Sequence, residues 1–179
     1  MGNYQQQHAN DKEIAAMTIK LHLGCSNMYP GPLDGWENLD IKKWNEKIVL
    51  HDLRKPLSYD TGTVSACFSC HTLEHLNRSD GSRLLAECFR VMKSGSPIRV
   101  IVPDFLGIID LYVSPNTLYF IAKKMPHPAK KWGTRESWLL EMLYPQDTDG
   151  GCQHKYMYTV KGLYLAMVNA GFKNVNSEA

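Results

Sequence analysis

The chain has 179 residues, of which 44% are hydrophobic and 21% are charged, and this composition excludes wholesale disorder. With 20 Lys and Arg against 18 Asp and Glu, the net charge is +2, which gives no general attraction to nucleic acid or to an anionic membrane. No apolar run approaches the roughly 18 residues that a membrane-spanning helix needs. The 5 cysteines, without an export signal, predict reduced thiols and a cytoplasmic location.

The predicted elements are strands separated by loops, helices and one long insertion. Residues 1–16 are polar and are expected to form a flexible N-terminal arm before a single domain over 17–179. Alternating or continuous apolar runs predict strands, and apolar residues at helical spacing predict helices. The expected strands are 19–23, 38–41, 48–50, 64–71, 98–102 and 172–175. Three helical regions are expected: one that begins at a cap on Ser79 or Asp80, one that fills most of 105–146, and one over 163–170.

The first of these helices is expected to bury one face, with Gly95 following its last turn. That face consists of Leu84, Leu85, Cys88, Phe89 and Met92. Strands that alternate with helices or crossovers predict an α/β fold with a mainly parallel sheet and helices on both faces. Ligands of such sheets bind outside the carboxyl ends of the strands, near the point where the strand order reverses.

The residues that follow the predicted strands are therefore the candidate site. Gly24, Cys25 and Ser26 let the backbone approach a ligand and offer N–H groups to it. Asp40 and Asp52 end the next two strands, where one carboxylate can accept the hydroxyls of a ribose and the other can reach an adenine. The segment lacks a Gly-x-Gly-x-x-Gly pattern, which counts against a nicotinamide cofactor.

Eight stretches in this order resemble the class I S-adenosylmethionine-dependent methyltransferases of the type 11 methyltransferase domain: LHLGCSN, GWENLDI, HDLRKPL, CHTLEHL, RLLAECFRVMKSG, IRVIVPD, HKYMY and AGFKNV. The resemblance covers roughly residues 18–176. It implies a Rossmann-like methyltransferase sheet and S-adenosylmethionine as the cofactor. The implied cofactor-binding residues are Gly24, Cys25 and Ser26 at the methionine part, Asp40 with Ile41 at the ribose, Asp52 and Leu53 at the adenine, and Cys70 and His71 near the sulfonium.

The chain departs from the family pattern in several places. Ser26 stands where the family usually has Gly, and His22 stands where an acid is common. The family sheet has a seventh strand, whereas this sequence stops where the sixth is expected to end, so the last strand is absent or the chain is truncated. The open sheet edge is then expected to pair with a second copy in a homodimer.

Methyl transfer is an in-line displacement that mainly requires alignment and exclusion of water. A base is needed only for a hydroxyl or a protonated amine, and the candidates are His71, Glu74, His75, Asp104 and His154. The insertion near 105–158 is expected to form a helical substrate cap. The predicted function is methyl transfer to a small-molecule acceptor of the sugar or lipid-linked kind. The alternative is a degenerate, non-catalytic cofactor-binding or interaction protein.

Other motifs point elsewhere and are disfavoured. Cys67-Phe68-Ser69-Cys70-His71 matches a c-type haem attachment pattern but lacks an export signal. His71-Thr72-Leu73-Glu74-His75 matches the inverted zincin motif, yet the following turn residues leave too little helix for two ligands on one face. A structural zinc site from Cys67, Cys70, Cys152 and His154 is less favoured than buried thiols. No metal is therefore predicted, and the basic segment 123–135 is interpreted as a solvated flank rather than a nucleic-acid surface.

Overall fold

The computed structural model describes residues 18–27, 30–114, 134–145 and 153–177. The chain divides into two compact units. The first comprises Met1–Cys70 and Ala86–Val100, and the second comprises His71–Leu85 and Ile101–Ala179. The predicted N-terminal arm lies outside the described residues. That residues 17–179 form a single domain, with a substrate cap near 105–158, stays a prediction.

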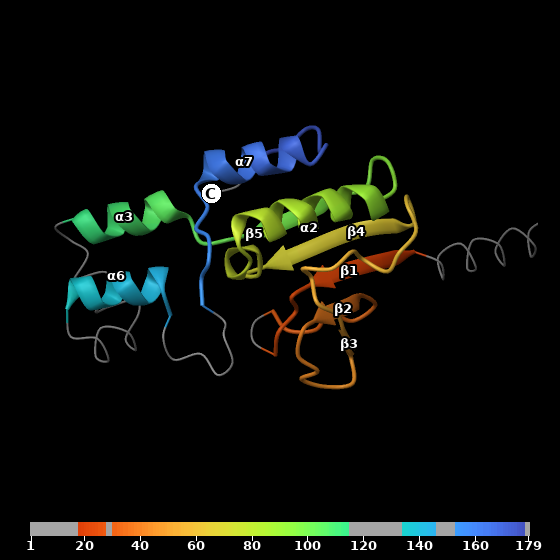
Figure 1. Ribbon diagram of the computed structural model, residues 1–179, viewed down its shortest axis with the longest axis horizontal. Coiled ribbons are helices and arrows are strands. Elements are labelled where there is room, and N and C mark those ends of the chain that lie inside the picture. The colour runs from red at the N-terminus through yellow and green to blue at the C-terminus, as the bar shows by residue number, and fades with distance from the viewer. Residues whose placement is uncertain (1–17, 28–29, 115–133, 146–152, 178–179) are drawn as a thin grey trace, which may run out of the picture. The chain divides into compact units, whose positions relative to one another are not determined.

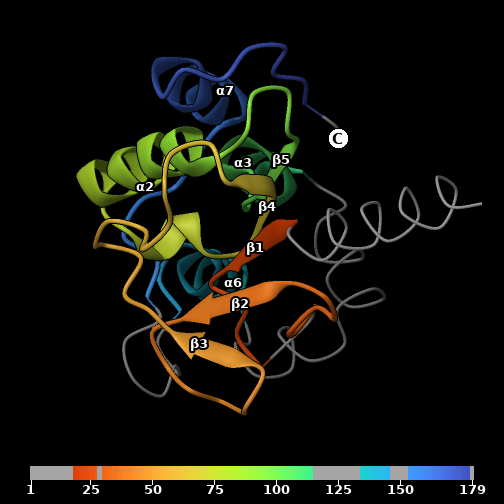
Figure 2. The ribbon, with the colours of Figure 1, turned by 90° about the vertical axis from the view of Figure 1, so that its right-hand side faces the viewer.

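The sheet has five strands in the order β3-β2-β1-β4-β5 (Figures 1 and 2). The β1–β2, β2–β3 and β1–β4 pairs are all parallel. The chain therefore builds outward from β1 to β3, and the strand order reverses between β1 and β4. The bounds are β1 (Ile19–Leu23), β2 (Glu37–Asp40), β3 (Ile48–Leu50), β4 (Val64–Cys70) and β5 (Ile98–Ile101).

The strand register brings the predicted cofactor residues to one edge of the sheet. Leu23 on β1 pairs with Leu39 on β2 and with Ser69 on β4. The next residue on each strand or just beyond it is Gly24, Asp40 or Cys70, so these three stand at the carboxyl ends of adjacent strands. The end of β1 is buried on both faces of the sheet, because Leu21, His22 and Leu23 are all almost fully buried.

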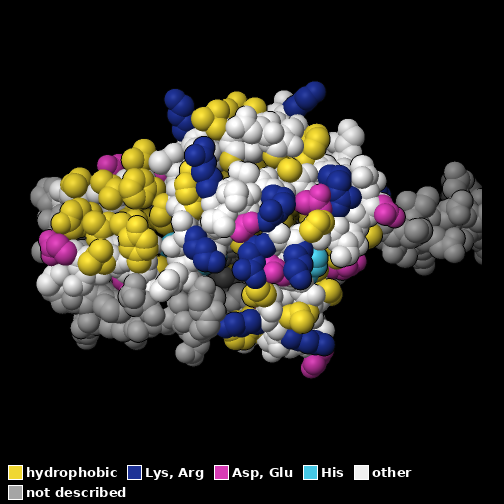
Figure 3. Space-filling view, in the orientation of Figure 1, with side chains coloured by type: hydrophobic (Ala, Val, Ile, Leu, Met, Phe, Trp, Pro, Cys, Tyr) yellow, Lys and Arg dark blue, Asp and Glu magenta, His cyan; other side chains and the backbone are white. Residues whose placement is uncertain are grey.

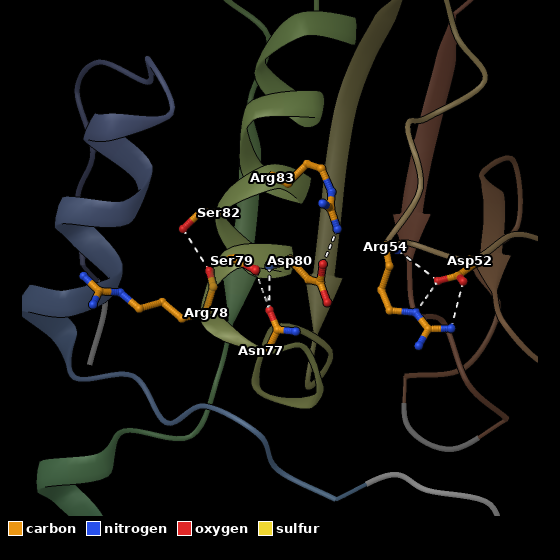
Figure 4. A network of polar contacts seen from close by, with 8 residues as sticks. All are labelled: Asp52, Arg54, Asn77, Arg78, Ser79, Asp80, Ser82 and Arg83. Atoms are coloured by element: carbon orange, nitrogen blue, oxygen red, sulfur yellow. Dashed lines mark hydrogen bonds and ion pairs between the residues drawn. The ribbon is translucent and has the colours of Figure 1, made fainter.

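Helix α2 (Arg78–Val91) follows β4 through a short 3₁₀ turn, η1 (Leu73–His75). Its cap is Asn77 rather than Ser79 or Asp80, because the Asn77 side-chain oxygen accepts a hydrogen bond of 2.8 Å from the Asp80 N–H (Figure 4). The predicted apolar face is confirmed for Leu84, Leu85, Cys88 and Met92, all of which are buried.

Phe89 is 48% exposed, so its placement on the buried face of α2 was wrong. It lies one position beyond Cys88, and a helix turns by about 100° between neighbours, which carries the ring out of the buried stripe. The helix itself ends at Val91, and Met92 already forms a parallel bridge with Val64.

The second unit is mainly helical. Its helices beyond α2 are α3 (Phe105–Val113), α6 (Arg135–Leu143) and α7 (Val160–Asn169), each begun by a side-chain cap from Asp104, Thr134 or Thr159. Ile108 and Trp138 form the buried centre of α3 and α6, with Leu111 and Met142 packed around them. Apolar side chains also gather on the outside of α3 (Figure 3), where Leu106 and Val113 are exposed.

A sixth strand does not form at residues 172–175, so that prediction was wrong. Gly171 has φ +110 and Asn174 has φ +56, and both values interrupt the extended backbone that a strand requires. Residues 115–133 and 146–152 lie outside the described part, so the helical prediction for 105–146 is confirmed only in α3 and α6. Within the described residues, no helix combines the length and apolar character that crossing a bilayer requires.

Candidate functional site

The turn after β1 has an unusual backbone conformation. Gly24 has φ +67 and Ser26 has φ +51, so two of its three residues lie in the left-handed region. Gly24 reaches that region without steric cost, whereas Ser26 does so against the preference of a residue with a Cβ. The Gly24 N–H donates to the Leu39 carbonyl at 2.8 Å, which fastens the turn to β2.

Asp40 holds the same turn from the other side. Its Oδ2 accepts the Ser26 N–H and its Oδ1 accepts the Lys42 N–H, each at 2.9 Å. The residue is only 9% exposed, so the carboxylate is fixed in position. Each oxygen can accept a further hydrogen bond, which leaves acceptor capacity for the two hydroxyls of a ribose.

The neighbouring predicted cofactor residues provide apolar surface. Cys25 is buried, and burial followed by the charge of Asp40 raises the pKa of its thiol to about 11, so it stays neutral. Ile41 is 55% exposed and Leu53 is buried. Because Ile41 follows Asp40, which is predicted to bind a ribose, its exposed side chain is a suitable contact for the apolar face of a nucleoside.

Asp52 is engaged by a neighbour in its own loop. Arg54 Nε contacts Oδ1 and Arg54 Nη2 contacts Oδ2, both at 2.8 Å (Figure 4). The hydrogen bond to Arg54 lowers the pKa of Asp52 to about 2. A base that approaches this carboxylate meets a fixed ion pair, so the Asp52 contact to adenine stays a prediction.

Asn38 on β2 is a structural determinant that sequence reasoning missed. Its Oδ1 accepts the Leu33 N–H at 2.7 Å, and its Nδ2 donates to the carbonyls of Leu33 and Trp36 at 3.0 Å each. The buried His22 Nδ1 lies 3.1 Å from the same Oδ1. The strand gave little signal for this role, because β2 reads ENLD and Asn38 is not its only polar residue.

In the second unit, the candidate acid–base residues gather around η1. Glu74 is fully buried, and its Oε1 lies 3.1 Å from His71 Nδ1. The hydrogen bond to Glu74 raises the pKa of His71. His71 has φ +52 and a side chain 58% exposed, so its ring is fixed at one nitrogen while much of it faces solvent.

The two remaining histidines face each other near Glu74. The His75 and His154 ring centroids lie 5.0 Å apart. His75 Nδ1 lies 3.3 Å from the Gln153 carbonyl, and His154 Nδ1 lies 3.0 Å from the Met142 carbonyl. Burial, followed by the charge of His75, lowers the pKa of His154, which favours the neutral imidazole at pH 7.

Asp104, the fifth candidate base, caps a helix. Its Oδ1 accepts the Leu106 N–H and its Oδ2 accepts the Gly107 N–H, both at 3.2 Å, which begins α3. The structure thus brings together His71, Glu74, His75 and His154 in one unit and places Asp104 in a cap. Cys152 lies outside the described residues.

Comparisons with known proteins agree with this arrangement. Residues 33–100 match the model of a methyltransferase domain family. A search of curated proteins finds no match. Among solved structures, the chain is similar to a SAM-dependent methyltransferase from Archaeoglobus fulgidus, with a TM-score of 0.55 and 16% identity, over 95% of this chain and 69% of that one.

Two further archaeal structures share the fold. A SAM-dependent methyltransferase from Methanosarcina mazei aligns with a TM-score of 0.51 and 15% identity, over 88% of this chain and 82% of that one. A Haloferax volcanii complex of a methyltransferase with the Trm112 methyltransferase activator aligns with a TM-score of 0.51 and 12% identity, over 92% of this chain and 67% of the matched chain.

The structural likeness confirms the predicted Rossmann-like fold class, since five strands run in the methyltransferase arrangement. The match over residues 33–100 supports the predicted methyltransferase class. Residues 33–100 are thus similar to a methyltransferase domain, and the chain shares its fold with solved SAM-dependent methyltransferases.

Proposed function

We propose that the first unit binds S-adenosylmethionine at the Gly24–Ser26 turn and Asp40, and that the protein methylates a hydroxyl of a small molecule of the sugar or lipid-linked kind. The observation that supports this proposal is the Asp40 carboxylate, which is buried, accepts hydrogen bonds from the Ser26 and Lys42 N–H groups, and stands at the carboxyl end of β2, next to β1. That edge is where ligands of parallel sheets bind.

A hydroxyl acceptor is favoured by the pair of Glu74 and His71. A carbonyl or carboxylate can only accept, so the 3.1 Å contact puts a proton on His71 Nδ1 and leaves Nε2 free to take one. This is the arrangement of a histidine base oriented by a carboxylate. In the proposed reaction, the acceptor oxygen attacks the methyl carbon, the carbon–sulfur bond breaks, and the electron pair stays on sulfur as a neutral thioether. The hydroxyl proton goes to a general base, and His71 Nε2 is a candidate to accept it.

The test is calorimetric titration with S-adenosylhomocysteine on the wild type, on Asp40→Ala and on Asp34→Ala. Asp34 is a matched control, because it is an acid of the same unit whose side chain is 89% exposed and paired only with Lys47. We expect micromolar binding to the wild type and the control, and at least tenfold weaker binding to Asp40→Ala. If the wild type does not bind S-adenosylhomocysteine, the proposal is contradicted.

A measurement of turnover distinguishes the proposed enzyme from the alternative of a non-catalytic cofactor-binding or interaction protein. Methyl transfer to hydroxyl acceptors should fall in His71→Gln at pH 7 by a much larger factor than S-adenosylhomocysteine affinity does. Cofactor binding without transfer to any sugar or lipid-linked hydroxyl favours the degenerate alternative. The homodimer through a sheet edge stays a prediction, which sedimentation at several protein concentrations checks.

A further inference from the structure

We propose that Glu74, His75 and His154 form a binding site for one divalent transition-metal ion. Each of the three side chains offers one ligand atom, and these atoms all lie within 4.8 Å of one another. All three residues belong to the second unit, so the site is complete within one compact part of the chain. Two imidazoles with one carboxylate are a common ligand set for such ions.

The two histidines are already held in the form that binds a metal. A carbonyl oxygen accepts hydrogen bonds and donates none, so the Gln153 and Met142 carbonyls place a proton on Nδ1 of His75 and of His154. In the neutral ring, Nε2 is then the nitrogen that carries the lone pair. Metal-bound histidines typically donate their other ring nitrogen in this way, which fixes the tautomer and the ring orientation.

Glu74 supplies an independent observation. The residue is fully buried, and its Oε2 makes no hydrogen bond in the described structure. The other oxygen, Oε1, is satisfied by His71. A buried carboxylate oxygen without a partner is costly, and a cation between Oε2 and the two imidazoles would satisfy it.

The backbone holds the ligands together although His154 is far from η1 in sequence. The Glu74 carbonyl accepts the Lys155 N–H at 2.7 Å and the Tyr156 N–H at 3.2 Å. In a tetrahedral zinc site, bonds of about 2.0–2.1 Å place ligand atoms about 3.4 Å apart. Closing the three ligand atoms around an ion therefore requires them to move together from separations of up to 4.8 Å.

Three protein ligands leave at least one coordination position open, as in catalytic rather than structural zinc sites. That position suits water or an acceptor hydroxyl, whose pKa the ion would lower. This role rests on the proposed function, whereas metal binding itself does not. The sequence alone predicts no metal, because no sequence pattern connects His154 with Glu74 and His75.

The experiment is a titration of the metal-free full chain with Co²⁺, followed by visible absorption, and then displacement by Zn²⁺. We expect one Co²⁺ per chain, with affinity at least 100-fold lower in Glu74→Gln and in His154→Ala. His71→Ala removes only the partner of Oε1, so a loss of about 10- to 100-fold is expected there. His51→Ala, a histidine of the first unit, is the matched control and should bind like the wild type.

Glu74→Gln keeps the shape of the side chain, and His154 is only partly buried, so one of the two variants is expected to remain folded; far-UV circular dichroism in EDTA checks this. The metal site is overturned if the wild type shows no saturable Co²⁺ binding, or if both ligand variants bind Co²⁺ as tightly as the wild type does. The S-adenosylhomocysteine titration is repeated in EDTA. Cofactor binding without Co²⁺ binding contradicts only the metal site, and the reverse result contradicts only the proposed function.

Discussion

The Ser26 N–H donates a 2.9 Å hydrogen bond to Asp40 Oδ2, across a separation of 14 residues. The acid proposed to bind ribose thus also shapes the turn proposed to hold the methionine part. Ser26 adopts φ +51 at that contact, so the hydrogen bond helps to stabilise a backbone conformation that serine rarely adopts. Cofactor affinity and local stability should therefore change together when Asp40 is altered.

Asp40→Asn tests how much the two hydrogen bonds to the Asp40 carboxylate stabilise the protein. An amide has one acceptor oxygen, so its NH₂ group must face one of the two backbone N–H groups that now donate to the carboxylate. We expect the free energy of unfolding to fall by about 1–3 kcal/mol, because one buried donor loses its partner. Urea denaturation measures the change, with Asp34→Asn as the control that should stay within about 0.5 kcal/mol of the wild type.

Ser26→Gly should stabilise the protein. A left-handed conformation costs a residue with a Cβ about 1–2 kcal/mol, whereas glycine adopts it freely at a smaller cost in unfolded-chain entropy. We expect a gain of about 0.5–1 kcal/mol in thermal or urea unfolding. The same replacement at the exposed helical Ser82 should lower stability instead. A loss at Ser26 as large as that at Ser82 would argue that the serine side chain, rather than its φ angle, decides the effect.

Gly81→Ala tests the packing of Tyr158. A Cβ built on Gly81 lies 2.7 Å from the Tyr158 hydroxyl oxygen but 4.0 Å from the ring carbon that carries it. Tyr158 is 4% exposed, so the ring cannot simply move away, and we expect a loss of about 1–3 kcal/mol despite the better helix propensity of alanine. Combining Gly81→Ala with Tyr158→Phe removes the clashing oxygen. The double variant should be more stable than the sum of the two single changes predicts.

Glu87 should contribute to the stability of the first unit in a way that is lost at acid pH. It accepts two hydrogen bonds of 2.8 Å from Arg90 and one of 2.8 Å from the Leu57 N–H, and the bond to Arg90 lowers its pKa below 4.5. Because the folded-state pKa is the lower one, the stabilisation is present above pH 4.5 and is lost as the pH falls through the folded value. Glu87→Gln should thus be about 1–3 kcal/mol less stable than the wild type at pH 7.

The Glu87→Gln deficit should shrink toward pH 3, which urea denaturation at both pH values measures. Exposed Glu46→Gln is the control and should show little difference at either pH. A deficit that stays constant between pH 7 and pH 3 would mean that packing, rather than the charge of Glu87, stabilises this contact.

The sequence predicted the local features well where one segment determines them. The apolar stripe of α2 follows from side-chain spacing alone, and the positions of Gly24 and Asp40 follow from where their strands end. The burial of β1 does not follow from its alternation, because His22 is as buried as the leucines on either side of it. The cap at Asn77 was missed because Ser79 and Asp80 have equal capping propensity, and only the backbone direction selects among them.

Features that depend on distant segments could not be predicted. His154 reaches η1 only through hydrogen bonds to the Glu74 carbonyl, and no periodicity links residues so far apart. The failed strand at 172–175 has the opposite cause, since apolar residues were present but Asn174 adopts a left-handed conformation that the pattern does not reveal.

Glu74 takes part in the structure through two separate groups. Its main-chain carbonyl anchors Lys155 and Tyr156, while its carboxylate faces the histidines. A substitution changes the second group and leaves the first in place. During divergence, a descendant can therefore lose the Glu74 carboxylate and its proposed role, and still keep Lys155 and Tyr156 hydrogen-bonded to the main chain of residue 74. Proteins with this architecture and a neutral residue at position 74 are thus expected to be folded, and selection on the architecture alone will not restore the acid.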